Sequence, residues 1–211
     1  MTENLLREQI AELGKSLYDR GLAHGSAGNV SVKLDDGGFL LTPTNSCLGR
    51  LDPARISRLD GNGKLMSGDA PSKESFLHLA MYQERAASAA VVHLHSLHAV
   101  AVSCLADVNA DDVFPPITAY AIMQVGKLAL VPYYPPGDQS LAEAVRKLAG
   151  KHHSVLLANH GPVVAGTSLT AAVNAIEELE QTAHLMLLLR GQHTRPLNAA
   201  QVAELNRRFP S

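Results

Sequence analysis

The 211-residue sequence is poor in cysteine and contains no long apolar run. Its two cysteines, Cys47 and Cys104, are far apart and form no CxxC pair, which is typical of reduced thiols in a cytosolic protein. No uninterrupted apolar stretch reaches the about 18 residues that a transmembrane helix needs. The N-terminal segment begins with acidic and polar residues, whereas a signal peptide has basic residues followed by an apolar block. These absences predict a cytoplasmic protein that does not enter a membrane.

Charge of neither sign dominates the chain. Eighteen Lys and Arg residues face 20 Asp and Glu residues, which gives a net charge of -2 and a pI near 6.5. This balance gives no indication of a nucleic-acid partner or of binding to a membrane surface. A small anionic substrate remains compatible with it, because local amides and single cations can hold one. The apolar share of 46% and the length favour one globular domain over residues 1–211.

The spacing of apolar residues predicts a mixture of helices and short strands. Apolar positions at helical spacing predict helices over residues 5–17, 72–80, 97–105, 139–148, 168–190 and 199–207, with Ser72 as the N-cap of the second. Two runs around Asp36-Gly37-Gly38 predict a hairpin, and two runs around the turn DGNG predict another. Further strands are expected in 89–95, in 127–133 and in 154–166, where Gly161-Pro162 would be the turn between two strands. The predicted class is α/β, with a mixed or antiparallel sheet covered by helices.

Ten histidines are present, and they cluster. The pair in His93-Leu94-His95 lies in a predicted strand, where alternate side chains share a face and stand about 6.5–7 Å apart at Cα. Two such imidazoles can bind one cation, although two histidines at the edge of a core would give the same pattern. His160 strengthens the metal interpretation, because it follows the apolar run SVLLA and precedes a glycine. Three neutral imidazoles leave an open coordination position, which is typical of a catalytic metal site.

Glu74 is the candidate acid/base. It lies in the first turn of a predicted helix behind Pro71 and Ser72, where the helix dipole favours a carboxylate. An ordinary helix-start glutamate would fit the same position. The small-residue loop before Gly28-Asn29 lets the backbone approach a ligand closely. Thr44, Asn45, Ser72 and Lys73 supply further hydrogen-bond donors, one of them cationic.

Taken together, these motifs resemble the class II aldolase/adducin family over about residues 5–190. The matching blocks keep the family's order and spacing: Gly28-Asn29-Val30-Ser31, Thr42-Pro43-Thr44, Pro71-Ser72-Lys73-Glu74, His93-Leu94-His95 and Asn159-His160-Gly161. The resemblance implies an α/β/α sandwich with a central, mostly antiparallel sheet. It also implies a homotetramer of fourfold symmetry with a zinc site between subunits, although Mn²⁺ also suits imidazole ligands.

The resemblance also implies roles for single residues. His93, His95 and His160 match the metal ligands, and Glu74 matches the acid/base that also reaches the metal in the resting state. The implied phosphate-binding positions are Gly28, Asn29, Thr44, Asn45, Ser72 and Lys73. Tyr120 matches a tyrosine that some members bring across the subunit interface as a proton donor. A tyrosine in an apolar stretch can equally be structural.

Two departures from the family pattern bear on the substrate. Asn45 replaces a glycine of the phosphate loop, and Lys73 stands where serine is frequent. Lys73 adds a positive charge, which suits a substrate with more negative charge than a plain sugar phosphate. The phrases SCLGRLDPARIS, VPYYPPGD and LLANHGPVV are most similar to family members that act on 3-oxo-tetronate 4-phosphate.

The implied reaction is decarboxylation of that sugar acid to dihydroxyacetone phosphate and CO2 through a metal-bound enediolate. Glu74 or Tyr120 would deliver the proton to carbon. A class II aldolase that cleaves a ketose 1-phosphate of the fuculose or rhamnulose type would use the same residues. A non-catalytic, adducin-like interaction domain is a third alternative, against which the three histidines and Glu74 argue.

Overall fold

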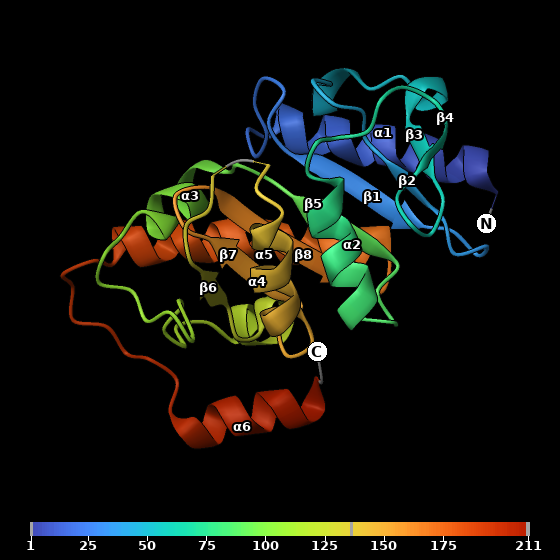
Figure 1. Ribbon diagram of the computed structural model, residues 1–211. Helices are drawn as coiled ribbons and strands as arrows, with labels where there is room; N and C mark the ends of the chain where they lie inside the picture. Colours follow the sequence, from blue (N-terminus) through green and yellow to red (C-terminus); the bar gives the residue numbers. More distant parts are fainter. Residues whose placement is uncertain (1, 136, 210–211) are drawn as a thin grey trace.

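The computed structural model describes residues 2–135 and 137–209 and is built around an eight-stranded sheet (Figure 1). The strand order is β4-β3-β2-β1-β5-β8-β7-β6. Neighbouring strands are antiparallel throughout, except that β6 and β7 are parallel. The strands are β1 (Asn29–Lys33), β2 (Phe39–Leu41), β3 (Ser57–Leu59), β4 (Leu65–Ser67), β5 (Ala90–His93), β6 (Ala129–Val131), β7 (Ser154–Leu157) and β8 (Gly161–Gly166). The predicted α/β class and the mostly antiparallel sheet are confirmed.

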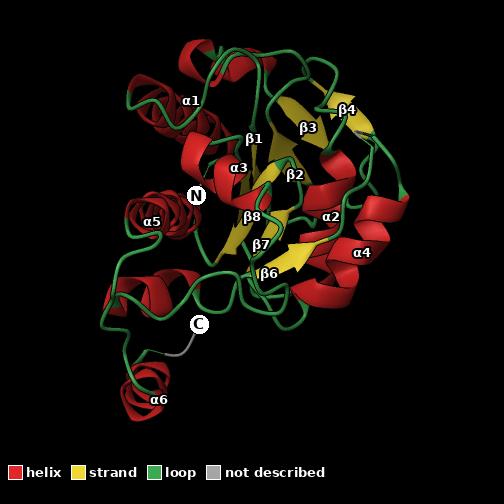
Figure 2. Cartoon of the chain, turned by 90° about the vertical axis from the view of Figure 1, so that its left-hand side faces the viewer, coloured by secondary structure: helices red, strands yellow, loops and turns green. Residues whose placement is uncertain are grey.

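Helices flank the sheet on both sides (Figure 2). One face packs against α1 (Glu3–Asp19), α3 (Leu97–Ser103) and α5 (Leu169–Leu188). The other face packs against α2 (Ser75–Glu84) and α4 (Ser140–Ala149). The remaining helical segments are η1 (Leu48–Arg50), η2 (Pro53–Arg55), the π-helix η3 (Ala121–Val125) and α6 (Ala199–Arg208). Among the described residues, no helix combines the length and the apolar character that crossing a bilayer requires.

Successive side chains of each strand point to opposite faces of the sheet, so the hydrophobic core consists of two parts, one on each face. Val30, Val92 and Leu156 point to the α1, α3 and α5 side, whereas Val91 and Val163 point to the α2 and α4 side. All five side chains are almost completely buried. Because helices cover both faces, the central strands are apolar on both faces, which explains runs such as AVVH and SVLL in the sequence.

The register of the central strands brings three chain segments to one place. Asn29 at the start of β1 pairs with His93 at the end of β5, and His93 pairs with Val163 near the start of β8. The turn that carries His160 precedes β8 directly. Histidines 65 or more residues apart in the sequence are therefore neighbours at one end of the sheet.

A glycine is required at position 161, because the main chain there passes close to the main chain of Leu94. A Cβ atom at position 161 would lie 2.3 Å from the Leu94 carbonyl oxygen, which is far inside van der Waals contact. A residue without a side chain therefore lets β8 begin directly beside the segment that leads to His95.

Two local predictions were wrong. Helix α2 begins at Ser75 with Glu74 at the N-cap, and Ser72 instead accepts the Glu74 N–H on its hydroxyl at 3.3 Å. The turn between β7 and β8 is formed by residues 158–160, and Gly161-Pro162 already belongs to β8. Asn159 takes the positive φ of 56° that this turn needs, a conformation that asparagine tolerates better than most residues.

We expect Gly161→Ala to destabilise the fold by about 3 kcal/mol or more, because the added methyl group must displace the Leu94 carbonyl or β8. Urea unfolding of the two proteins measures this difference. Gly150→Ala is the matched control, since a Cβ there meets no atom within 4 Å and φ is -61°. That control should be neutral or slightly stabilising. Equal midpoints for Gly161→Ala and the wild type would contradict the argument.

Candidate metal centre

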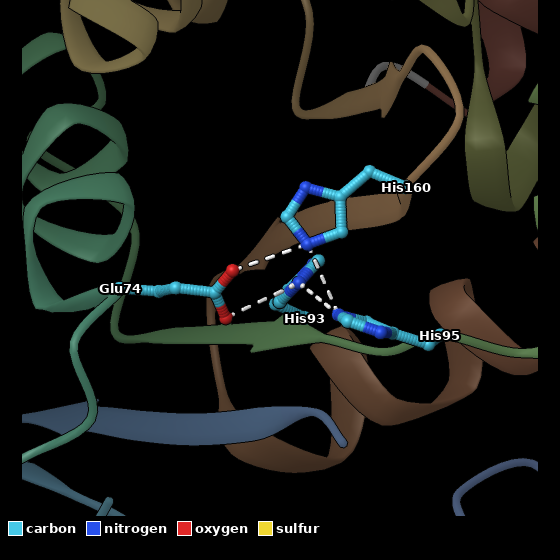
Figure 3. A group of neighbouring side chains, drawn as sticks. All are labelled: Glu74, His93, His95 and His160. Carbon is cyan, nitrogen blue, oxygen red and sulfur yellow. Dashed lines mark hydrogen bonds and ion pairs between the residues drawn. The ribbon is translucent and has the colours of Figure 1, made fainter. Parts of the chain in front are cut away.

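Four side chains from distant parts of the sequence converge on one point (Figure 3). One potential ligand atom from each of Glu74, His93, His95 and His160 lies within 4.8 Å of all the others. The His95 Nε2 atom is 3.0 Å from Nε2 of His93 and 3.1 Å from Nε2 of His160. The carboxylate oxygens of Glu74 lie 3.4 Å from His93 Nε2 and 3.1 Å from His160 Nε2.

Each of these side chains is positioned by the end of an element. His93 is the last residue of β5, whereas His95, which was predicted in the same strand, lies two residues beyond its end. His160 ends the turn between β7 and β8, and Glu74 is the N-cap of α2. The predicted convergence of the three histidines and Glu74 is therefore what the structure contains.

The hydrogen bonding of His93 favours a metal ligand. Its Nδ1 is 2.8 Å from the carbonyl oxygen of Pro162, which can only accept, so Nδ1 carries the proton. In a neutral His93, Nε2 therefore carries a lone pair, and this lone pair points into the cluster. Metal-binding histidines are characteristically oriented by such a bond from the second ring nitrogen. The four side chains could thus hold one divalent cation, with three nitrogens and one carboxylate as donors.

Burial keeps the imidazoles of His93 and His95 neutral. Desolvation lowers the pKa of His95 to about 3, and the neighbouring rings of His93 and His160 act in the same direction. Burial also lowers the pKa of His93, which is fully enclosed. For Glu74, burial raises the pKa, but His93, His160 and a hydrogen bond from Asn29 outweigh it, and the pKa lies well below its ordinary value. Neutral imidazoles beside a carboxylate are the protonation states that a metal requires.

The cluster opens into a cavity of about 750 Å³. Glu74, His95 and His160 form part of its wall. The other lining residues are Gly21, His24, Leu97, Val100, Tyr133, Tyr134 and Asn159. His24, Tyr133 and Tyr134 were not predicted from the sequence as lining residues. A histidine next to the glycine-rich loop and the tyrosine pair in VPYYPPGD were the available signals.

The predicted phosphate-binding segments lie beside one another. The Thr44 N–H donates to the Ala70 carbonyl at 2.9 Å, and the Ser72 N–H donates to the Thr42 carbonyl at 3.2 Å. Asn45 has a φ of 56°, so it adopts the left-handed conformation for which glycine is the usual choice. Lys73 is exposed and immediately precedes Glu74.

Gly28 and Asn29 lie against residues of the histidine and glutamate cluster itself. Gly28 has a φ of 86°, and a Cβ there would lie 3.0 Å from the His93 carbonyl oxygen. Asn29 is buried, and its Nδ2 donates to Glu74 Oε2 at 2.8 Å. These contacts bring the start of β1 against both the histidine pair and the carboxylate.

Tyr120 is the predicted site residue that lies apart from the cluster in its own chain. It is 64% exposed and lines a different cavity, together with Gln124 and Glu177. It also caps the π-helix η3, and π-helical turns occur frequently at functional sites.

The sequence of the chain matches one family of known proteins. Residues 8–187 match the model of the class II aldolase and adducin N-terminal domain. The chain is a member of the class II aldolase and adducin family. It is 48% identical to the 3-oxo-tetronate 4-phosphate decarboxylase of Escherichia coli K12, over 96% of both chains. It is 37% identical to the L-fuculose phosphate aldolase of Methanococcus maripaludis, over 86% of this chain and 96% of that one.

A solved structure agrees with the fold. The crystal structure of YgbL from Klebsiella pneumoniae, described as an aldolase, epimerase or decarboxylase, superposes with a TM-score of 0.95 at 48% identity. The superposition covers 97% of this chain and 99% of that chain. The resemblance on which the family prediction depended is therefore confirmed for nearly the whole chain.

We expect the metal-free protein to lose stability as the pH falls below about 6.5. His95 and the fully buried His78 have pKa values near 3 when folded and near 6.5 when unfolded. The unfolded chain therefore binds protons first, so their contribution is complete above the unfolded pKa and is lost toward the folded pKa. Urea unfolding in EDTA at a series of pH values measures the slope. The slope reports how many more protons the unfolded chain binds than the folded one, and His95→Gln should lower this number by up to about one. A stability that rises on acidification would contradict the assignment.

Proposed function

We propose that this protein decarboxylates 3-oxo-tetronate 4-phosphate to dihydroxyacetone phosphate and CO2. The observation that carries the proposal is the three-imidazole, one-carboxylate centre on an open cavity, in a chain 48% identical to a decarboxylase of that name over nearly its full length. The broader prediction of a carbon–carbon lyase is confirmed, because the relatives are named as decarboxylases and aldolases. We treat residues 1–211 as a single class II aldolase/adducin-like domain.

In this proposal, His93, His95, His160 and Glu74 hold the divalent cation. We infer Zn²⁺ from the donor set, with Mn²⁺ as the alternative. When bound, the cation supplies a Lewis acid that draws electron density from the substrate's 3-oxo group. The Nδ1–H bond from His93 to Pro162 fixes one ring before the cation arrives, so little reorganisation is needed.

The main chemical task left to side chains is to protonate the substrate carbon from which CO2 departs. Loss of CO2 leaves the electron pair of the broken bond on C2 of the substrate, and C2 must gain one proton to give the hydroxymethyl group of the product. We assign this delivery to Glu74, which lines the cavity next to the cluster. Each CO2 released consumes one proton from solvent. The low resting pKa of Glu74 means that it takes up this proton only during turnover, after its contacts with the cluster are broken.

We infer that the loops beside the cluster bind the substrate phosphate. Gly28, Thr44, Asn45 and Ser72 supply main-chain and hydroxyl donors, and Lys73 supplies the positive charge. Asn29 was predicted to join them. Its side-chain amide is already bonded to Glu74 at one end and to His78 at the other, so its contact with phosphate stays a prediction.

Two other functions remain as competitors. A ketose 1-phosphate aldolase would use the same cluster, and a relative with 37% identity is named as such. Aldol cleavage begins by removing a hydroxyl proton, for which Glu74 would be the base. A non-catalytic adducin-like domain would have no need for converging imidazoles, and the geometry in Figure 3 argues against it.

We further propose that the active form is a homotetramer in which the Tyr120 hydroxyl acts together with Glu74 as a proton donor in a neighbouring subunit's site. Two observations support this. Tyr120 is exposed and away from the cavity of its own chain. Helix α6 has no buried residue and lies at the edge of the molecule next to η3 (Figure 1), although a ten-residue helix is rarely stable without an extensive packing partner. The cytoplasmic location stays a prediction.

The substrate assignment is tested by incubating the metal-loaded protein with 3-oxo-tetronate 4-phosphate and, separately, with ketose 1-phosphates. We expect CO2 and dihydroxyacetone phosphate in equal amounts from the first substrate and little cleavage of the others. Triose phosphate released from a ketose 1-phosphate without CO2 would instead establish the aldolase.

Variants of the cluster separate binding from proton transfer. His95→Ala should lose both metal and activity, because only two imidazoles would be left to hold the cation. Glu74→Gln should keep the metal on three histidines while its turnover falls by about 10²–10⁴-fold. Metal content by elemental analysis and turnover by CO2 release are measured on the same samples. Wild-type turnover in Glu74→Gln would remove this residue from the mechanism.

The intersubunit role of Tyr120 is tested by complementation. Tyr120→Phe and Glu74→Gln should each be nearly inactive alone. When the two are unfolded and refolded together, about a quarter of the sites combine an intact Glu74 with an intact Tyr120 from a neighbour, and activity should return to that extent. Mixed refolding that gives only the average of the two single variants would place both residues in one chain.

A further inference from the structure

A buried chain of polar side chains leads from Glu74 into the core between β1 and α2. Asn29 Nδ2 donates to Glu74 Oε2 at 2.8 Å, and Asn29 Oδ1 lies 2.5 Å from His78 Nε2. His78 Nδ1 lies 2.7 Å from Ser31 Oγ, which is 2.7 Å from the Tyr82 hydroxyl. The four residues behind Glu74 are almost completely buried, so their polar atoms need partners inside the protein, and the Tyr82 hydroxyl has a further one in the main chain of Val91.

Two periodicities of the sequence build this chain. Asn29 and Ser31 are alternate residues of β1 and therefore share one face of the sheet. Glu74, His78 and Tyr82 are spaced by four residues at the start of α2 and along it, so they share one side of the helix. The packing of α2 on the sheet interleaves the two sets.

The direction of every hydrogen bond follows from the carboxylate end. An ionised Glu74 can only accept, so Asn29 turns its amide nitrogen toward it and its carbonyl oxygen toward His78. His78 must then donate from Nε2, which leaves Nδ1 to accept from the Ser31 hydroxyl. Ser31 in turn accepts from Tyr82. Each donor therefore points toward Glu74.

The members of this chain stay uncharged. Burial lowers the pKa of His78 to about 3, and burial raises the pKa of the Tyr82 hydroxyl above its ordinary value. The chain therefore ends in a single negative charge, the carboxylate of Glu74.

We propose that His78 is a positioning residue, whose Nε2–H holds the Asn29 amide so that Glu74 is kept in one orientation toward the metal centre. His78 is separated from Glu74 by Asn29 and is not part of the cavity wall, so it acts through Asn29. Without that donor, the Asn29 amide can turn over and present its oxygen to the carboxylate, which is repulsive. The catalytic part of this proposal rests on the proposed function, in which Glu74 transfers the proton.

The first test needs neither metal nor substrate. Nitrogen NMR of the metal-free, histidine-labelled protein at neutral pH distinguishes protonated from unprotonated ring nitrogens. We expect the His78 Nε2 to carry the proton and its Nδ1 to be bare. A proton on Nδ1 would reverse the direction of the chain and overturn the proposal.

The second test compares three variants. His78→Phe keeps the ring shape but removes the donor, whereas His78→Gln places an amide nitrogen near the former Nε2 and keeps it. His153→Phe is the matched control, since His153 is also a mostly buried histidine but precedes β7 at the end of that strand remote from His160. We expect kcat to fall about 10–100-fold in His78→Phe with KM unchanged, to recover in His78→Gln and to stay at the wild-type level in His153→Phe.

A spectroscopic measurement separates this proposal from the proposed function. Cobalt(II) in place of the native cation reports the ligand arrangement by its absorption. The spectrum should change in His78→Phe, return in His78→Gln and stay unchanged in His153→Phe, whichever substrate the enzyme uses. If the protein releases no CO2 but shows these spectra, the substrate assignment is wrong and the positioning role of His78 still holds. Unchanged cobalt spectra, or kcat lost equally in His78→Phe and His78→Gln, would refute the role of His78. If His78→Phe fails to fold, the NMR measurement on the wild type still decides.

Discussion

The approach of two imidazole Nε2 atoms, those of His93 and His160, to hydrogen-bond distance of His95 Nε2 is the constraint on which the site depends. Such rings cannot all be charged at this separation, and burial of His93 and His95 keeps them neutral. The neutral rings then offer lone pairs to one point, and Glu74 supplies the only negative charge in the cluster. A divalent cation would compensate that charge and could use all four donors, so the electrostatics of the cluster and its proposed function have the same origin.

The sheet provides this constraint through its register. Asn29, His93 and Val163 lie in line across β1, β5 and β8, and the tight turn before β8 adds His160 at the same end. Gly28 and Gly161 allow the backbones to meet closely there. The helix behind the sheet then adds Glu74 from its N-cap and, through His78 and Tyr82, the buried polar chain that orients it. The site is thus a joint product of strand register and helix packing, and a shift of either would separate the ligands.

Much of the local structure was predictable. The hairpin at Asp36-Gly37-Gly38 has the turn chemistry that joins two alternating strands, and the long apolar stripe of α5 has helical spacing over 20 residues. Element ends were less predictable, as the N-cap of α2 and the turn at Asn159 show, because several short polar residues compete for each end. Local patterns singled out the His93 and His95 pair and His160 among ten histidines, and the family resemblance then assigned them and Glu74 to one site.

By itself, the sequence determined the α/β class, the histidine pair at a strand end and the third histidine before a glycine, because these depend on local spacing, and the resemblance of its motif blocks identified the family. Only the tertiary structure decided that His160 meets His93 and His95, that Tyr120 lies away from the cavity of its own chain, and that His78 stands behind Asn29. Those facts depend on strand order and helix packing, which join residues far apart in the chain and leave no periodic trace in the sequence.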